Sequence, residues 1–154
     1  MKLKALLLGV FFCLMAATGS LADDGFIGTW KLNEAKSKFA PGPTRNSTVV
    51  YEASGDSVKI TIDGIGADGK PSHNEWTGKF DGKDYPVTGN PAEDTRALKK
   101  VNDHTLQLTL KKDGKVTMTG SIVLSSDGKT RTVTTSGKDE KGNKVTNTTV
   151  YEKQ

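Results

Sequence analysis

The sequence predicts an all-β protein, an antiparallel up-and-down meander that closes into a barrel of about 8–10 strands. Apolar and polar residues alternate along much of the chain, and no long stretch shows the helical period. Short turns rich in glycine and aspartate separate these segments, so neighbouring strands are expected to pair antiparallel. The segments near the two ends, 26–32 and 149–153, both have strand character. Pairing between them would close the sheet and leave a lumen.

The first 22 residues have the features of a secretory signal peptide. Lys2 and Lys4 precede an apolar run over residues 5–15. Ser20 and Ala22 are the small residues of a cleavage site. The run is much shorter than the roughly 20 residues that span a bilayer, so no stable membrane anchor is expected after cleavage. We therefore expect an exported protein, periplasmic or secreted, with one mature domain over residues 23–154.

The composition of the mature chain excludes several classes of site. Cys13 is the only cysteine and lies in the signal, so the mature chain has no disulfide, thiolate nucleophile or cysteine metal ligand. Without Lys2 and Lys4 the formal net charge of +4 falls to +2, and the remaining charges are interspersed. Because nucleic-acid binding needs a clustered basic stripe with aromatic residues, we expect no nucleic-acid partner.

Ten segments of the mature chain are expected to form strands. In order they are 26–32, 46–53, 57–63, 72–80, 83–88, 94–101, 105–112, 115–124, 129–136 and 144–152. Their separators contain good turn formers such as Asp113-Gly114, because glycine accepts the positive φ of a tight turn. Two stretches break the pattern: 33–46 fits a single helical turn or an irregular cap, and 88–94 fits a longer loop.

Alternation also predicts which side chains point into the barrel. The inward sets are Val58, Ile60 and Ile62; Leu106, Leu108 and Leu110; and Val116, Met118, Ile122 and Leu124. Neither face of the last two strands is strongly apolar, because threonine is abundant in both. One face must still point inward, so the lumen is expected to be part polar. Such a lumen suits a small amphipathic ligand, and equally an inert, partly hydrated barrel.

Gly28-Thr29-Trp30, placed before a long β meander, resembles the Gly-x-Trp motif of the calycin superfamily of lipocalins and fatty-acid-binding proteins. The run 26–32 is similar to the start of a fatty-acid-binding protein, and Val150-Tyr151-Glu152-Lys153 is similar to the end of one. The resemblance is detailed at these termini and architectural between them. It implies a barrel in which Trp30 packs across one end.

The chain also departs from that pattern. The fatty-acid-binding proteins that it resembles hold the ligand carboxylate with an Arg-x-Tyr on the last strand, and the matching residues here are Thr149 and Tyr151. The bidentate arginine contact is therefore missing from that place. The segment 33–46 is too short for their two-helix lid, and Gln154 follows the last strand without the C-terminal helix typical of lipocalins. We expect a lipocalin-like domain over 23–154 rather than a true fatty-acid carrier.

The candidate ligand-binding residues are Tyr151, Trp76, Arg131 and Thr149. Tyr151 could donate a hydrogen bond in the lumen. Arg131 could replace the missing cation, because it is expected to share the inward face of its strand with Val133 and Thr135. Arg96 is the other arginine within a strand that could bind an anion. Each candidate has a structural alternative: a packed closing tyrosine, a core tryptophan or a solvated arginine.

Metal binding and catalysis are not expected. His73 and His104 do not share a strand, and no spacing of carboxylates would complete a metal site around either, so we expect no metal and no cofactor. Ser–His–Asp and Cys–His signatures are absent, so we do not expect an enzyme. A pair of carboxylates brought together by the barrel is the one route to catalysis that the sequence leaves open.

Two functions follow from these observations. The first is a monomeric, exported, lipocalin-like protein that binds a small hydrophobic or amphipathic molecule non-covalently in its lumen. The alternative is an envelope or structural protein that acts through its outer surface and has a packed barrel interior. A lumen of several hundred cubic ångström favours the first, and a filled interior with an apolar outer patch favours the second.

Overall fold

A computed structural model describes residues 24–40, 44–138 and 141–154, so the predicted signal over residues 1–22 lies outside the described residues. Ten strands form a closed, all-antiparallel barrel, and the described residues contain no helix. The strands are β1 (Gly28–Lys38), β2 (Arg45–Ser54), β3 (Ser57–Ile65), β4 (Pro71–Gly78), β5 (Tyr85–Thr88), β6 (Thr95–Asn102), β7 (Thr105–Lys112), β8 (Lys115–Leu124), β9 (Thr130–Lys138) and β10 (Lys144–Lys153). The predicted fold class is confirmed.

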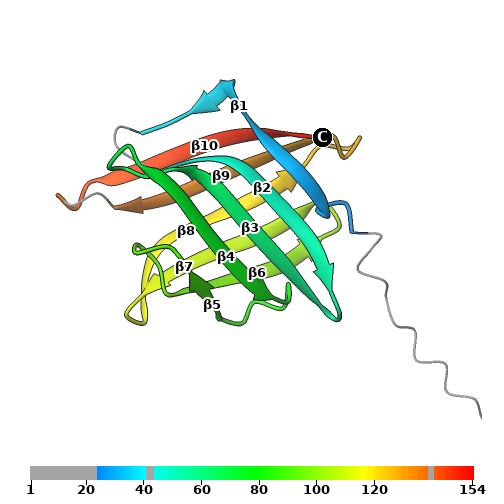
Figure 1. Ribbon diagram of the computed structural model, residues 1–154, viewed down its shortest axis with the longest axis horizontal. Helices are drawn as coiled ribbons and strands as arrows, with labels where there is room; N and C mark the ends of the chain where they lie inside the picture. The colour runs from blue at the N-terminus through cyan, green and yellow to red at the C-terminus, as the bar shows by residue number, and fades with distance from the viewer. Residues whose placement is uncertain (1–23, 41–43, 139–140) are drawn as a thin grey trace, which may run out of the picture.

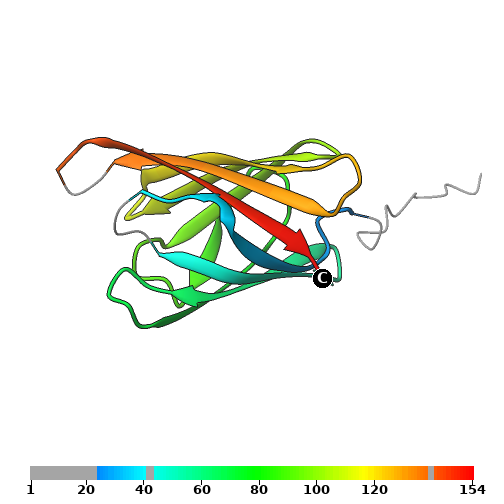
Figure 2. The ribbon, with the colours of Figure 1, turned by 90° about the horizontal axis from the view of Figure 1, so that it is seen from above.

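The first strand closes the barrel. Each strand pairs with its sequence neighbours, and β1 pairs with both β2 and β10 (Figure 1). Trp30 lies opposite Val49 on one side and opposite Lys153 on the other. Seen from above, β1 runs between β2 and β10 (Figure 2). The predicted meeting of the two terminal segments is therefore what seals the sheet.

β1 is longer than the sequence indicates. Residues 33–38, expected as part of a helical turn or irregular cap, continue the strand and contain a bulge between Asn33 and Lys38. The Ser37 hydroxyl accepts a hydrogen bond from the Val150 amide at 2.9 Å and donates one to the Asn33 carbonyl at 2.7 Å. That prediction was wrong because pairing with β10 overrides the weak local preference of a polar segment. The predicted loop between β5 and β6 is present.

The inward faces largely follow the predicted alternation. The sets on β3 and β7 form part of the core, with Ile122 and Leu124 of β8. Val116 is an exception, because its side chain is 56% exposed. A register shift between Leu110 and Lys111 of β7 changes the pairing there, so the start of β8 no longer keeps the inward phase of Ile122.

Aromatic side chains fill the end of the barrel where β1 begins. Phe26 and Trp30 are fully buried, and the Trp30 indole donates a hydrogen bond to the Phe26 carbonyl at 2.9 Å. Phe26 packs edge-to-face on Phe80, with 6.1 Å between ring centroids. The Lys153 ammonium lies 5.3 Å from the centre of the Trp30 ring and donates to the Gly25 carbonyl at 3.1 Å. This end is therefore plugged.

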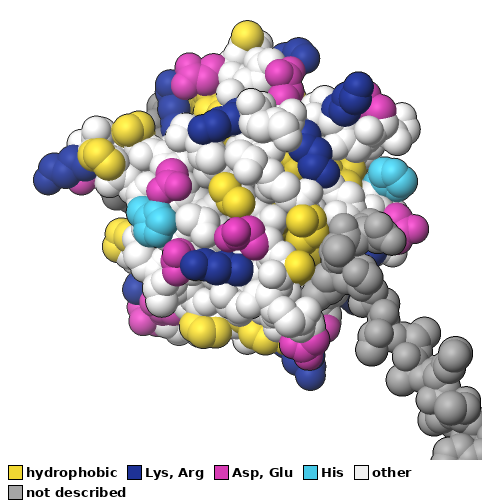
Figure 3. Space-filling model, turned by 45° about the vertical axis from the view of Figure 1, so that its right-hand side comes forward, with side chains coloured by type: hydrophobic (Ala, Val, Ile, Leu, Met, Phe, Trp, Pro, Cys, Tyr) yellow, Lys and Arg dark blue, Asp and Glu magenta, His cyan; other side chains and the backbone are white. Residues whose placement is uncertain are grey.

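The outer surface mixes both signs of charge. On the face in Figure 3, basic and acidic side chains are interspersed and the hydrophobic side chains form small separate groups. The large exposed hydrophobic residues in the described part of the chain are Ile65, Val101, Val116 and Val123, which lie on three different strands. Such scattered exposure is normal for a protein surface.

Gly120 lies within β8 at a point where β9 passes very close. A Cβ atom added there would lie 2.2 Å from the Thr134 carbonyl oxygen. We expect Gly120→Ala to destabilise the barrel by about 1–3 kcal/mol, because the two backbones would have to move apart. Chemical denaturation would measure this against Thr119→Ala, the adjacent exposed position on β8. Equal stability of the two variants would contradict the prediction.

Candidate functional site

A cavity of about 380 Å³ occupies the interior of the barrel. Aliphatic side chains form most of its wall: Val49, Ile60, Ile62, Leu98, Leu108, Leu110, Ile122 and Val133. Away from the plugged end, residues of the connecting loops line it, including Phe39, Ala67 and Ala92. Thr135, Asn147 and Thr149 bring polar groups from β9 and β10, as the threonine-rich sequence of those strands predicts. The lumen is thus mainly apolar with local polar groups.

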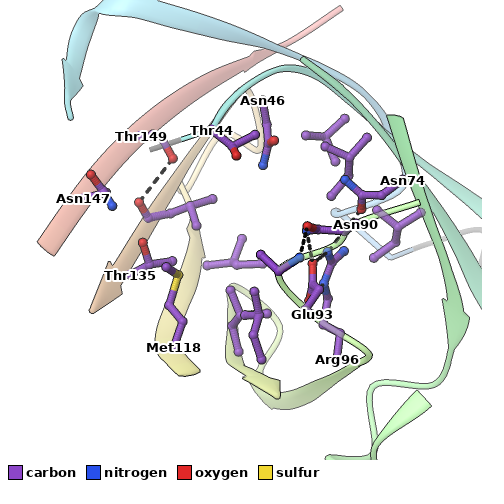
Figure 4. Close-up of a pocket in the computed structure, with 18 of the residues that line it drawn as sticks. Thr44, Asn46, Asn74, Asn90, Glu93, Arg96, Met118, Thr135, Asn147 and Thr149 are labelled. Carbon is purple, nitrogen blue, oxygen red and sulfur yellow. Dashed lines mark hydrogen bonds and ion pairs between the residues drawn. The ribbon is translucent and has the colours of Figure 1, made fainter. Parts of the chain in front are cut away.

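The polar groups lie on two facing walls (Figure 4). Asn74, Asn90, Glu93 and Arg96 cluster on one wall, and Thr135 and the other residues of β9 and β10 lie across the open space. The residues of the first group bond to one another, with Glu93 and Arg96 forming an ion pair. The second leaves hydroxyl and amide groups beside the cavity.

Arg131 lies at the inner end of the cavity, against the aromatic plug. Its side chain is 2% exposed, and it lines the cavity from β9. Its guanidinium lies 4.5 Å from the ring centre of Tyr151, 5.1 Å from that of Tyr51 and 5.3 Å from that of Trp30. The ring faces attract the cation, which accounts for its position.

No carboxylate among the described residues pairs with Arg131. Its Nε atom is buried without a hydrogen-bond partner, and no described acid lies within salt-bridge distance of the guanidinium. Glu93, the only acid among the lining residues, is already paired with Arg96. Burial raises the pKa of the Tyr151 phenol, so Tyr151 is neutral at physiological pH and does not balance the charge. The arrangement is a buried cation open to an anion.

Three of the four predicted ligand-binding residues meet at this cavity. Arg131, Thr149 and Tyr151 all line it. The Thr149 hydroxyl donates to the Val133 carbonyl at 3.4 Å, a long hydrogen bond, and Tyr151 packs beneath the guanidinium of Arg131. Strand alternation places all three correctly on the inner face. Their binding roles remain predictions.

Trp76 does not line the cavity, contrary to the expectation that it would. It is 1% exposed, its indole donates to the Arg96 carbonyl at 2.9 Å, and its ring packs edge-to-face on Tyr85. Gly78 provides the space for this packing, because a Cβ there would lie 2.6 Å from both aromatic rings. Trp76 is therefore a core residue that anchors β4 to β5 and β6.

Sequence reasoning missed the buried polar cluster on the opposite wall. Glu93, which belongs to the predicted longer loop over 88–94, is 2% exposed and forms an ion pair with the buried Arg96. The Asn90 amide donates to Glu93 at 2.8 Å, and Arg96 donates to the Asn74 side chain at 3.2 Å. The only local signal is the spacing of three residues between Glu93 and Arg96, which occurs by chance in many loops. Glu93 is thus held between Asn90 and Arg96 at the cavity wall.

The two histidines lie outside the cavity lining. His73 is on the outer face of β4, where its Nδ1 atom lies 2.6 Å from Asp63 and its Nε2 atom 3.7 Å from Glu75. His104 is in the turn between β6 and β7. The described residues contain no group of three or more side chains that could hold a metal ion. They also contain no helix long and apolar enough to cross a bilayer.

No protein-family model matches the chain, and no curated protein matches it at a significant level. The geometry of the cavity is therefore the main indication of function.

Removing the acid of the buried pair is expected to be costly. Glu93→Gln should destabilise the protein by about 3–5 kcal/mol, because it leaves Arg96 as an uncompensated buried charge. The double variant Glu93→Leu/Arg96→Met should lose much less stability, since no buried charge remains. Urea denaturation measures both, and Glu75→Gln, which breaks the surface pair with Lys59, is the control. A cost for Glu93→Gln no larger than for the control would contradict this.

The His73 contact predicts a pH-dependent stability. Hydrogen bonding to Asp63, with added attraction from Asp63 and Glu75, raises the pKa of His73 above its usual 6.5. The stabilisation that protonated His73 gives the fold is therefore complete below about pH 6.5 and declines as the pH rises through the folded-state pKa of His73. His73→Gln should lower the melting temperature more at pH 5.5 than at pH 9. NMR titration of the wild type and of Asp63→Asn would test the cause. The variant should show a lower pKa of His73, and an unchanged pKa would exclude Asp63 as the source of the shift.

Proposed function

We propose that this protein binds a small amphipathic anion non-covalently in its barrel lumen, with the acidic group on Arg131. The observation that carries the proposal is the buried guanidinium at the inner end of the cavity with no described carboxylate beside it. Burying an unpaired charge costs several kcal/mol, and cation–π contacts offset only part of this. A ligand anion would complete the site.

The remainder of the cavity supports an amphipathic ligand rather than a free inorganic anion. Beyond Arg131 the wall is chiefly aliphatic, so it would contact an apolar body. The volume of about 380 Å³ holds roughly a dozen non-hydrogen atoms at about 30 Å³ each. Tyr151 and Thr149 would add hydrogen bonds near the acidic group.

The same observations weigh against the alternative of a structural protein acting through its surface. That alternative expects a packed interior and an apolar outer patch, whereas the barrel is hollow and its described exposed apolar residues are scattered. Binding by an exported lipocalin-like barrel also agrees with the signal-like start of the chain and with Trp30 at the plugged end. The proposal requires no catalytic step, cofactor or metal.

Arg131→Met tests the proposal with octanoate and 1-octanol as matched charged and neutral probes. The wild-type protein should bind octanoate, and the variant should bind it at least about tenfold more weakly, because a charge-assisted hydrogen bond contributes about 1.5–3 kcal/mol. Affinity for 1-octanol should change little. Isothermal titration calorimetry measures all four affinities.

Without ligand, the same substitution should raise the melting temperature, because it removes a buried unpaired charge. A loss of binding together with a gain in stability separates a ligand contact from a folding defect. Arg131→Lys is the second control, since it keeps the charge but loses the planar fork. Equal octanoate affinity of wild type and Arg131→Met would refute the role of Arg131.

A further inference from the structure

β1 and β2 separate halfway along their length. Their pairing ends at Lys31 and Thr48, and the rest of β1 follows β10 as far as Lys38. The start of β2 pairs only with β3, as in the pairing of Arg45 with Ile65. In Figure 1 the end of β1 lies towards β10 and away from β2. The bulge in β1 thus leaves a gap in the barrel wall beside β2.

A groove of about 510 Å³ occupies this gap. Leu32 and Glu34 line it from β1, Arg45 and Ser47 line it from β2, and Ile65 lines it from the end of β3. Ile65 is 45% exposed, and of the four large exposed hydrophobic residues in the described chain it is the one that lines this groove. The groove therefore offers apolar surface outside the lumen.

The groove adjoins the lumen at Phe39. Phe39 and Ala67 line both spaces, and the Arg45 guanidinium lies 4.8 Å from the centre of the Phe39 ring. Leu32 packs against the core and also lines the groove. An apolar segment that left the lumen beside Phe39 would therefore meet Leu32 and Ile65 rather than water.

We propose that this groove is a second subsite, which binds the apolar segment of a lumen ligand that is longer than the cavity. The inference rests on the proposed function. Arg131 lies at the plugged end of the cavity and Phe39 at the other, so a ligand with its acidic group on Arg131 directs its apolar end towards Phe39. Since the lumen holds roughly a dozen non-hydrogen atoms, a longer chain must emerge there.

A chain-length series tests the second subsite. Unbranched alkyl carboxylates of 8, 10, 12, 14 and 16 carbons would be titrated calorimetrically below their micellar concentrations. Octanoate and decanoate fit within the lumen. If the groove binds the emerging chain, affinity should continue to rise beyond decanoate by up to about fourfold per added methylene, the transfer value for a buried CH₂.

Ile65→Asp should remove this gain for the 12–16-carbon acids and leave octanoate affinity within about twofold. Val101→Asp is the matched control, because Val101 is 54% exposed, lies on β6 and lines neither space. The control should retain the gain. An affinity that levels off at decanoate in the wild type, or equal effects of the two aspartate substitutions, would overturn the second subsite.

These results are distinguishable from failure of the proposed function. Arg131-dependent octanoate binding without a gain for longer acids leaves the lumen site intact and excludes the groove. Absence of binding for every acid in the series overturns both proposals. A gain for longer acids that persists in Ile65→Asp shows that the extra contacts lie elsewhere and also excludes the groove.

Discussion

The pairing of β1 with both β2 and β10 is the interaction on which the rest of the structure depends. It turns a linear meander into a ring, and the number of strands then fixes the width of the interior. Eight strands enclose a space that side chains can just fill, so a ring of ten leaves room. Short inward residues on the last two strands, such as Thr135 and Thr149, add to that room. The lumen is thus a consequence of closure and strand number.

The aromatic plug determines the chemistry of that lumen. Phe26 and Trp30 close one end, and Trp30 provides one of the three rings on which the Arg131 guanidinium rests. The rings fix the cation in place without neutralising it. A side chain held in this way has little rotamer freedom left to lose when an anion arrives, so the site is organised before binding. The plug and the anion site are therefore parts of one structure.

Much of this architecture could be predicted from the sequence because it depends on local signals. Alternation and glycine turns located ten strands, and alternation on β9 placed Arg131 inside. The exceptions depend on contacts between distant residues. The strand over 33–38 exists because Asn33 and Lys38 pair with β10 and the Ser37 hydroxyl accepts a hydrogen bond from Val150. Val116 is exposed because the pairing of β7 with β8 shifts by one residue at Thr117. Neither the strand over 33–38 nor the exposure of Val116 can be predicted from a local sequence pattern.

The candidate site shows the same division. Tyr151 and Thr149 follow from the two-residue period of the last strand. Burial of Glu93 could not be predicted, because it requires a loop to fold onto an arginine and two asparagines from different parts of the chain. Trp76 has the correct inward phase, but its ring is covered by Tyr85, so phase alone does not separate a core residue from a lining residue.

The shortest strand, β5, is the most weakly paired part of the barrel wall. β5 shares only two residue pairs with β4 and two with β6, and one of its four residues is Pro86, which has no amide hydrogen to donate. Few backbone hydrogen bonds need to break for the wall to part there, so local opening of β5 requires far less free energy than unfolding of the whole barrel. We therefore expect local opening of the native state to begin at β5.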